Sequence, residues 1–252
     1  MRQRAAFDLL NPHGQFPLVL TCEHASYAVP AAYQGLGLRS EEIRRHIGWD
    51  IGARAVVESL SQALDAPAVC AGYSRLLIDC NRDLRAHDLI VPESDGTRVP
   101  GNQGLSEAER QKRSEWFYQP YHAAIDRLLI SKGAIRPTLL SLHSFTPVLG
   151  KKERPFDLGI LFDQYADLAQ EVGQRLHHCG YQVRYNEPYS GLEGLIFSAH
   201  SHGSRHGLVY LELEINNSLI AHPERAAKMG KQISEVLRVL FSATEEQEER
   251  LR

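Results

Sequence analysis

The hydrophobic pattern of the chain alternates short apolar runs with longer amphipathic stretches. Residues 138–142 are apolar or small throughout and lead into His143, which is typical of a strand buried on both faces of a parallel or mixed sheet. A second run, 16–22, predicts another buried strand and is followed by Glu23 and His24. Because such sheets bind ligands at the carboxyl ends of their strands, we expect these polar side chains at a site. Further strands are expected at 66–71, 75–79, 154–162, 181–185 and 207–216.

Apolar residues at three- and four-residue spacing predict helices between these strands. A capping box at 106–109 opens one long helix, which Pro120 is expected to kink or divide. Residues 84–105 are rich in proline and glycine and predict a long irregular loop. Helices are expected at 51–64, 106–129, 165–178 and 223–241, with a short one at 40–46. At 198–207, His200, His202 and His206 could line a pocket, but we favour a solvated turn for at least two of the three.

Composition and charge narrow the class of protein. With 252 residues, 43% of them hydrophobic, the chain can bury one substantial core, and we expect one domain over 1–252, with its core at about 16–241 and a charged tail at 243–252. A formal charge of -3 gives no electrostatic reason to expect a nucleic-acid or anionic-membrane partner. The polar amino terminus and the lack of a long apolar run predict a cytoplasmic protein. Four dispersed cysteines without a CxxC pair are expected to be reduced thiols.

The candidate chemistry lies at the predicted strand ends. His24, His143 and Glu214 each occur there, and Asp50 stands at the first turn of a predicted helix. Two imidazoles and one carboxylate form the ligand set of a catalytic zinc site, and a further glutamate can act as a base. Glu212 and Glu214 alternate onto one face of an apolar strand, which is costly unless they are paired, protonated or near a metal. The alternatives are a packed core histidine at 143 and an ordinary helix cap at Asp50.

Two arginines flank the predicted strand at 75–79. Arg75 and Arg82, with Asn81 beside the second, suit a bidentate grip on a carboxylate. The alternative is a pair of surface ion pairs with Asp79 and Asp83.

Five short motifs follow one another along the chain: Cys22–Ser26, His46–Ala53, Ser74–Arg82, His143–Pro147 and Leu213–Asn216. They occur in the order seen in N-formylglutamate amidohydrolases, and the chain resembles that family from about residue 16 to 240. The resemblance implies a zinc-peptidase-like α/β fold, a three-layer sandwich with a mixed sheet. It also implies hydrolysis of N-formyl-L-glutamate to formate and L-glutamate, the final step of one histidine-degradation route.

The resemblance also implies roles for individual residues. The metal would be Zn²⁺ or another divalent ion, and the partner a small N-acyl amino acid. It assigns His24, Asp50 and His143 as metal ligands with Glu23 and His46 in reserve, Glu214 as the general base, and Arg75, Asn81, Arg82 and Ser144 as substrate-binding residues.

Three alternatives stay open at this point. The loop at 84–105 could reshape specificity toward a related N-acyl amino acid or a small peptide-like amide. A non-enzymatic module could use the same pocket to bind a carboxylate ligand or a partner. A serine or cysteine hydrolase is disfavoured, because Ser144 is only a sequence neighbour of His143 and no G-x-S-x-G elbow occurs. The sequence carries no signal of an oligomeric state.

Overall fold

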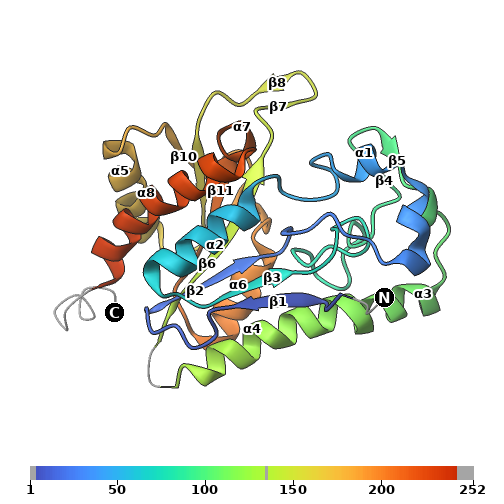
Figure 1. Ribbon diagram of the computed structural model, residues 1–252, viewed down its shortest axis with the longest axis horizontal. Coiled ribbons are helices and arrows are strands. Elements are labelled where there is room, and N and C mark those ends of the chain that lie inside the picture. Colours follow the sequence, from blue (N-terminus) through green and yellow to red (C-terminus); the bar gives the residue numbers. More distant parts are fainter. Residues whose placement is uncertain (1–3, 134–135, 243–252) are drawn as a thin grey trace.

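A mixed β-sheet forms the centre of the molecule in this computed structural model, which describes residues 4–133 and 136–242. Within those residues the sheet has seven strands in the order β1-β3-β2-β6-β11-β9-β10 (Figure 1). Strands β3, β2, β6 and β11 run parallel, whereas β1 and β9 run antiparallel to their neighbours β3 and β11. The strand bounds are Phe7–Leu10 (β1), Leu18–Cys22 (β2), Ala68–Ala71 (β3), Thr138–Phe145 (β6), Leu158–Leu161 (β9), Val183–Tyr185 (β10) and Tyr210–Asn216 (β11).

The central strand β6 is buried along its whole length, as its apolar sequence predicts. Its register places His143 opposite Glu214 of β11, and Ser141 opposite Thr21 of β2. The carboxyl ends of β2, β6 and β11 therefore meet at one edge of the sheet, and this edge holds the site.

Helices cover both faces of the sheet. Alternate residues of a strand point to opposite faces, so β6 contributes side chains to the core on each side. Leu140 and Leu142 pack in the core beneath α2 (Ala53–Leu64), α5 (Ala166–His178) and α8 (Pro223–Phe241). Leu139 packs in a second core beneath α4 (Gln119–Ser131) and α6 (Phe197–His206). The predicted three-layer α/β sandwich with a mixed sheet is confirmed, with α2, α5 and α8 on one side and α4 on the other (Figure 1).

The remaining elements lie outside the sheet. Two short hairpins, one inside the loop predicted at 84–105, and several brief helices connect the layers. They are η1 (Ala31–Gly37), α1 (Ser40–Ile43), β4 (Glu93–Ser94), β5 (Thr97–Arg98), η2 (Pro100–Asn102), β7 (Val148–Leu149), β8 (Lys152–Glu153), η4 (Gly191–Glu193) and α7 (Asn217–Ile220).

The long helix expected at 106–129 is divided. Ser106 caps α3 (Glu107–Arg113) by accepting a hydrogen bond from the Glu109 amide at 3.2 Å. A π-helical turn, η3 (Ser114–Tyr118), follows, and α4 begins at Gln119 with Pro120 in its first turn. The division therefore lies just before Pro120. In the first turn of a helix the backbone amides have no partner within the helix, so the amide hydrogen that proline lacks costs no hydrogen bond there.

Two predicted elements are wrong, and one strand is missed. Residues 75–79 are not a strand: the Leu77 amide donates to the Ser74 carbonyl at 2.9 Å, and the turn buries its apolar side chains in the core. Residues 198–207 are not a solvated turn but most of α6, whose Gly203 lets the helix pack closely on the ring of Tyr210. The edge strand β1 was not predicted.

The remaining predictions concern the cysteines, membrane-spanning helices, the charged tail and the number of domains. All four cysteines are free in the described part of the chain, as expected. Among the described residues, none of the helices combines the length and the apolar character that crossing a bilayer requires. The charged tail at 243–252 lies outside the described residues, and a single domain over 1–252 stays a prediction.

Candidate metal centre

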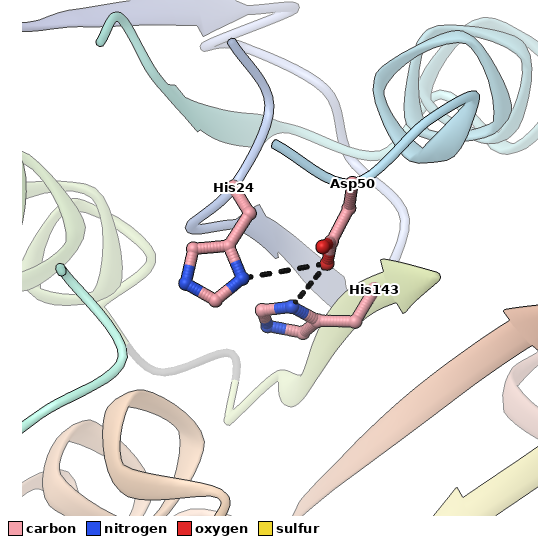
Figure 2. A group of neighbouring side chains, drawn as sticks. All are labelled: His24, Asp50 and His143. Atoms are coloured by element: carbon pink, nitrogen blue, oxygen red, sulfur yellow. Dashed lines mark hydrogen bonds and ion pairs between the residues drawn. The ribbon is translucent and has the colours of Figure 1, made fainter. Parts of the chain in front are cut away.

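Three predicted ligands converge at the carboxyl edge of the sheet. His24 follows β2, His143 lies in β6, and Asp50 lies in the turn that leads into α2 (Figure 2). Asp50 Oδ2 lies 3.4 Å from His24 Nδ1 and 2.8 Å from His143 Nδ1, and all three side chains are buried. Asp50 is not the cap of α2, because that position belongs to Gly52.

The second nitrogen of each imidazole faces a buried carboxylate. His24 Nε2 lies 2.7 Å from Asp79 Oδ1, and His143 Nε2 lies 3.0 Å from Glu23 Oε2. Carboxylates beside Nε2 favour the tautomer that carries its proton there, and this leaves the Nδ1 lone pairs directed at Asp50. Three acceptor atoms pointing at one place repel one another unless a proton or a metal ion lies between them. The donor set therefore fits a metal ion.

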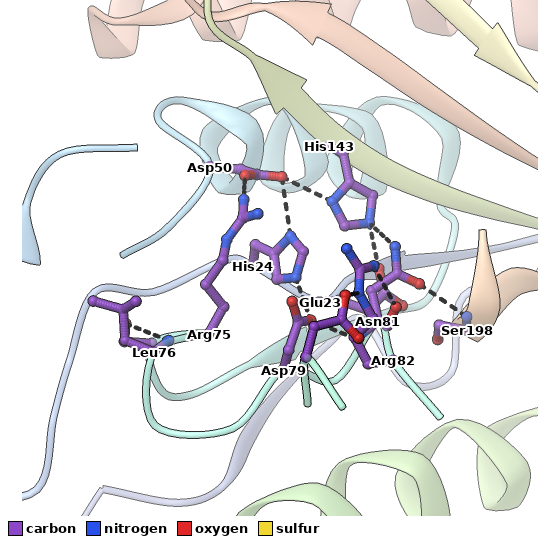
Figure 3. A network of polar contacts seen from close by, with 12 residues as sticks. Glu23, His24, Asp50, Arg75, Leu76, Asp79, Asn81, Arg82, His143 and Ser198 are labelled. Carbon is purple, nitrogen blue, oxygen red and sulfur yellow. Dashed lines mark hydrogen bonds and ion pairs between the residues drawn. The ribbon is translucent and has the colours of Figure 1, made fainter. Parts of the chain in front are cut away.

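Glu23, a reserve ligand, is itself held in a network behind the imidazoles (Figure 3). It accepts hydrogen bonds from Tyr121 Oη at 2.9 Å and Ser141 Oγ at 2.6 Å. Burial alone would raise the pKa of Glu23, but His143 and Ser141 hold it well below its usual range. Burial alone would lower the pKa of the His143 imidazole, but Glu212 and Glu23 raise it to about 9. The carboxylates thus favour positive charge at this position.

The two glutamates of β11 both face His143, as their alternation predicts. A ligand atom of each lies within 4.8 Å of one on His143. Glu212 Oε2 accepts a hydrogen bond from Asn81 Nδ2 at 3.3 Å, whereas Glu214 Oε2 is buried without a hydrogen-bond partner in residues 4–133 and 136–242. Burial raises the pKa of both carboxyl groups. An unpaired buried carboxylate beside a histidine is a candidate base.

Comparison with known proteins decides the family. The model of the N-formylglutamate amidohydrolase family matches residues 16–221. The chain belongs to this family. Among solved structures, a gene product of Agrobacterium tumefaciens is 31% identical, with a TM-score of 0.87 over 94% of this chain and 96% of that one. The N-formylglutamate amidohydrolase of Ralstonia eutropha is 22% identical and shows the same fold, with a TM-score of 0.73 over 94% of this chain and 97% of that one. No curated protein matches.

Four residues of this family member were predicted to bind substrate, and the structure gives each a partner within the chain. The Arg75 guanidinium contacts Asp50 Oδ1, and the Arg82 Nε donates to Asp88 Oδ2 at 2.7 Å. The alternative to substrate binding was that the two arginines form ion pairs with Asp79 and Asp83. The structure instead pairs them with Asp50 and Asp88. Asn81 Oδ1 accepts from the Ser198 amide at 2.9 Å, and Ser144 Oγ donates to the Ile51 carbonyl at 2.9 Å.

The reserve ligand His46 lies at the margin of the metal centre. Its Nδ1 is 3.6 Å from Asp50 Oδ1, and burial lowers the pKa of its imidazole to about 2. This ring faces the Asp50 oxygen opposite the one that His24 and His143 share.

Sequence reasoning missed three residues of the site. Asp79 was considered only as an ion-pair partner, and Tyr121 was given no role. Arg154, at the end of β8, is 5% exposed; its Nη1 donates to the Thr146 carbonyl at 3.4 Å, and its buried Nε has no partner among the residues described. A charged residue directly after a short hairpin gave no signal that it would be buried next to the carboxyl end of β6.

Proposed function

We propose that this family member is a metal-dependent amidohydrolase that cleaves the formyl amide of N-formyl-L-glutamate to formate and L-glutamate. The observation that carries the proposal is the approach of His24 Nδ1 and His143 Nδ1 to Asp50 Oδ2, with Glu214 close to His143. Two imidazoles and one carboxylate are the set that catalytic zinc sites use, so Zn²⁺ is the ion we expect. When bound, the ion supplies Lewis acidity toward the formyl carbonyl and lowers the pKa of water.

Asp79 and Glu23 orient the ligand imidazoles in this proposal. Each carboxylate accepts the Nε2 proton of its histidine, which fixes the ring and keeps Nδ1 free for coordination. His46 and Glu23 are then supporting residues.

Glu214 acts as the general base. Its buried carboxylate takes a proton from the water that attacks the formyl carbon, and it returns the proton to the amide nitrogen as the C–N bond breaks. Burial raises the pKa of Glu214 to about 7, although His143, Arg75 and Arg154 each lower it.

Arginines hold the two carboxylates of the substrate. Arg75 and Arg82 were predicted for this role, and Arg154 joins them because its buried guanidinium leaves Nε unpaired within the described chain. Arg154 Cζ also lies 5.0 Å from the centre of the Tyr189 ring, which limits its movement. The Nε of Arg75 is likewise buried without a partner among the described residues, so both arginines keep a spare donor for a carboxylate ligand.

Metal content and formate release test the proposal together. The full-length protein should hold about one zinc ion at this centre, and His143→Ala should lose both that ion and formate release from N-formyl-L-glutamate. His87→Ala, which removes an exposed histidine of the 84–105 loop, is the matched control and should change neither. If His143→Ala retained both the ion and the activity, the assignment would be wrong.

Specificity is tested separately on a panel of N-acyl amino acids. The narrow substrate predicts a kcat/KM for N-formyl-L-glutamate well above that for N-formyl-L-methionine, and Arg154→Gln should raise KM for the first more than for the second. Equal values on the two substrates would leave an amidohydrolase of broader specificity. Histidine degradation and a cytoplasmic location stay predictions.

A further inference from the structure

A second group of histidines lies between helices α4 and α6, outside the candidate metal centre. Helix α4 presents His122 and Asp126, and helix α6 presents His202 and His206. Each pair is separated by four residues, so its members lie on the same face of their helix. The two pairs face each other where α4 packs against α6.

Asp126 joins the two helices through one oxygen. Its Oδ1 lies 2.8 Å from His202 Nδ1 and 2.8 Å from His206 Nε2, and one ligand atom from each of the three lies within 4.8 Å of the others. His202 is 1% exposed, while the other two are partly exposed, so an ion can reach them from solvent.

The surroundings of these three residues match those of metal ligands. His122 Nδ1 lies 2.8 Å from His202 Nε2 and can accept its proton, which leaves His202 Nδ1 free on the side of Asp126. Arg205 Nη1 donates to the second oxygen of Asp126 at 2.9 Å. Partners of this kind fix the tautomer of a ligating imidazole and hold a ligating carboxylate in place.

We propose that Asp126, His202 and His206 form a second metal site that binds Zn²⁺ or a similar divalent transition metal. Two imidazoles and one carboxylate favour such ions over Mg²⁺ or Ca²⁺, which prefer oxygen ligands. The proposal does not depend on the activity of the first centre.

The site would fasten together two helices that support the amidohydrolase centre. Tyr121 of α4 donates to Glu23, and the Ser198 amide in the first turn of α6 donates to Asn81. An ion held by both helices keeps these two donors in register. In this proposal the ion has a structural role, because it links two helices that support the amidohydrolase centre.

Zinc titration of the metal-stripped, full-length protein tests this inference. The wild type should bind about one zinc equivalent more than His206→Gln. The zinc affinity of this site should fall by more than about 100-fold in the variant, because loss of a residue that only supports a ligand already lowers metal affinity by about 10- to 100-fold. His200→Gln is the matched control, since His200 lies on the same helix but pairs with Asp163 at 2.5 Å. Zinc should also raise the Tm of the wild type more than that of His206→Gln.

Two further variants keep the test decisive. In the His143→Ala background, which removes the first centre, about one equivalent should remain and should vanish on adding His206→Gln. His122→Phe should keep the stoichiometry but weaken the binding by about 10- to 100-fold. The inference is overturned if His206→Gln and Asp126→Asn both leave zinc stoichiometry and affinity unchanged. A first centre without zinc would instead show as one equivalent in the wild type and none in His206→Gln, so the two failures are distinct.

Discussion

Asp79 offers the sharpest test of the amidohydrolase centre, because it contacts a ligand but not the metal position. Its Oδ1 lies 2.7 Å from His24 Nε2 and accepts a second hydrogen bond from the Asn81 amide at 2.8 Å. Burial alone would raise the pKa of Asp79, but His24 and two arginines hold it far below its usual range, so the carboxylate is charged. Asp79→Asn keeps the shape of the side chain and removes that charge.

The expected loss follows from the role of the partner. Removing a carboxylate that orients a ligating histidine costs about 10- to 100-fold in metal affinity, which corresponds to about 1.4 to 2.8 kcal/mol. We expect the zinc Kd of Asp79→Asn to rise by that factor in a competition titration against a chelator. Asp83→Asn, an exposed partner of Arg85 in the same segment, should leave the Kd unchanged. A folded Asp79→Asn with a Kd within about twofold of the wild type would refute the reasoning.

Three further predictions test the general base Glu214, the hydrogen bond from Tyr121 to Glu23, and the ion pairs of Asp8 in the edge strand β1. Glu214→Gln should lower kcat by about 10²- to 10⁴-fold with zinc content unchanged, and activity near that of the wild type would reject Glu214 as the base. Tyr121→Phe should lower the free energy of unfolding by about 1.5 to 3 kcal/mol in urea titrations, because Glu23 loses a buried donor; no change would mean that water replaces it. Burial would raise the pKa of Asp8, but hydrogen bonds from Arg54 and Arg4 hold it below its usual value. The charged carboxylate therefore stabilises the folded protein at neutral pH, and this stabilisation is lost as the pH falls through the lowered pKa. Asp8→Asn should therefore lower Tm at pH 7 by an amount that shrinks below about pH 4, and a constant difference would contradict this.

The fold could be predicted wherever burial and periodicity agree. Strand β6 and helix α8 have patterns that only one element satisfies: a buried stretch of eight residues that begins with five apolar or small ones, and a three-four spacing over 19 residues. Residues 76–78 are as apolar as a strand, yet they are buried as a turn that Ser74 closes through its backbone and side chain. Helix α6 was missed because its serines, glycine and histidines have weak helix propensity. It forms because it packs against β11, and a local pattern does not carry that information.

The sequence named the three side chains that meet at the candidate metal centre, but it did not name the residues that support them. His24 and His143 mark the ends of two apolar runs, and parallel strands bring such ends together. The partner of His24 lies in a segment that was expected to be a strand, and Tyr121 reaches Glu23 across 98 positions in sequence. No spacing rule connects residues that meet only because a helix packs on a particular face of the sheet.

The two glutamates of β11 show why Glu214 could be assigned as the base only through the family resemblance. Both carboxylates share one face of one strand, both are buried, and both lie near His143, so alternation treats them alike. Their hydrogen bonds separate them. Glu212 accepts from Asn81, whose own oxygen accepts from the Ser198 amide, so Glu212 is one end of a chain of bonds that fixes the supporting loop. Glu214 has an oxygen with no such partner among the described residues, and a base needs an oxygen that is free to take a proton. This difference in pairing supports Glu214 rather than Glu212 as the base.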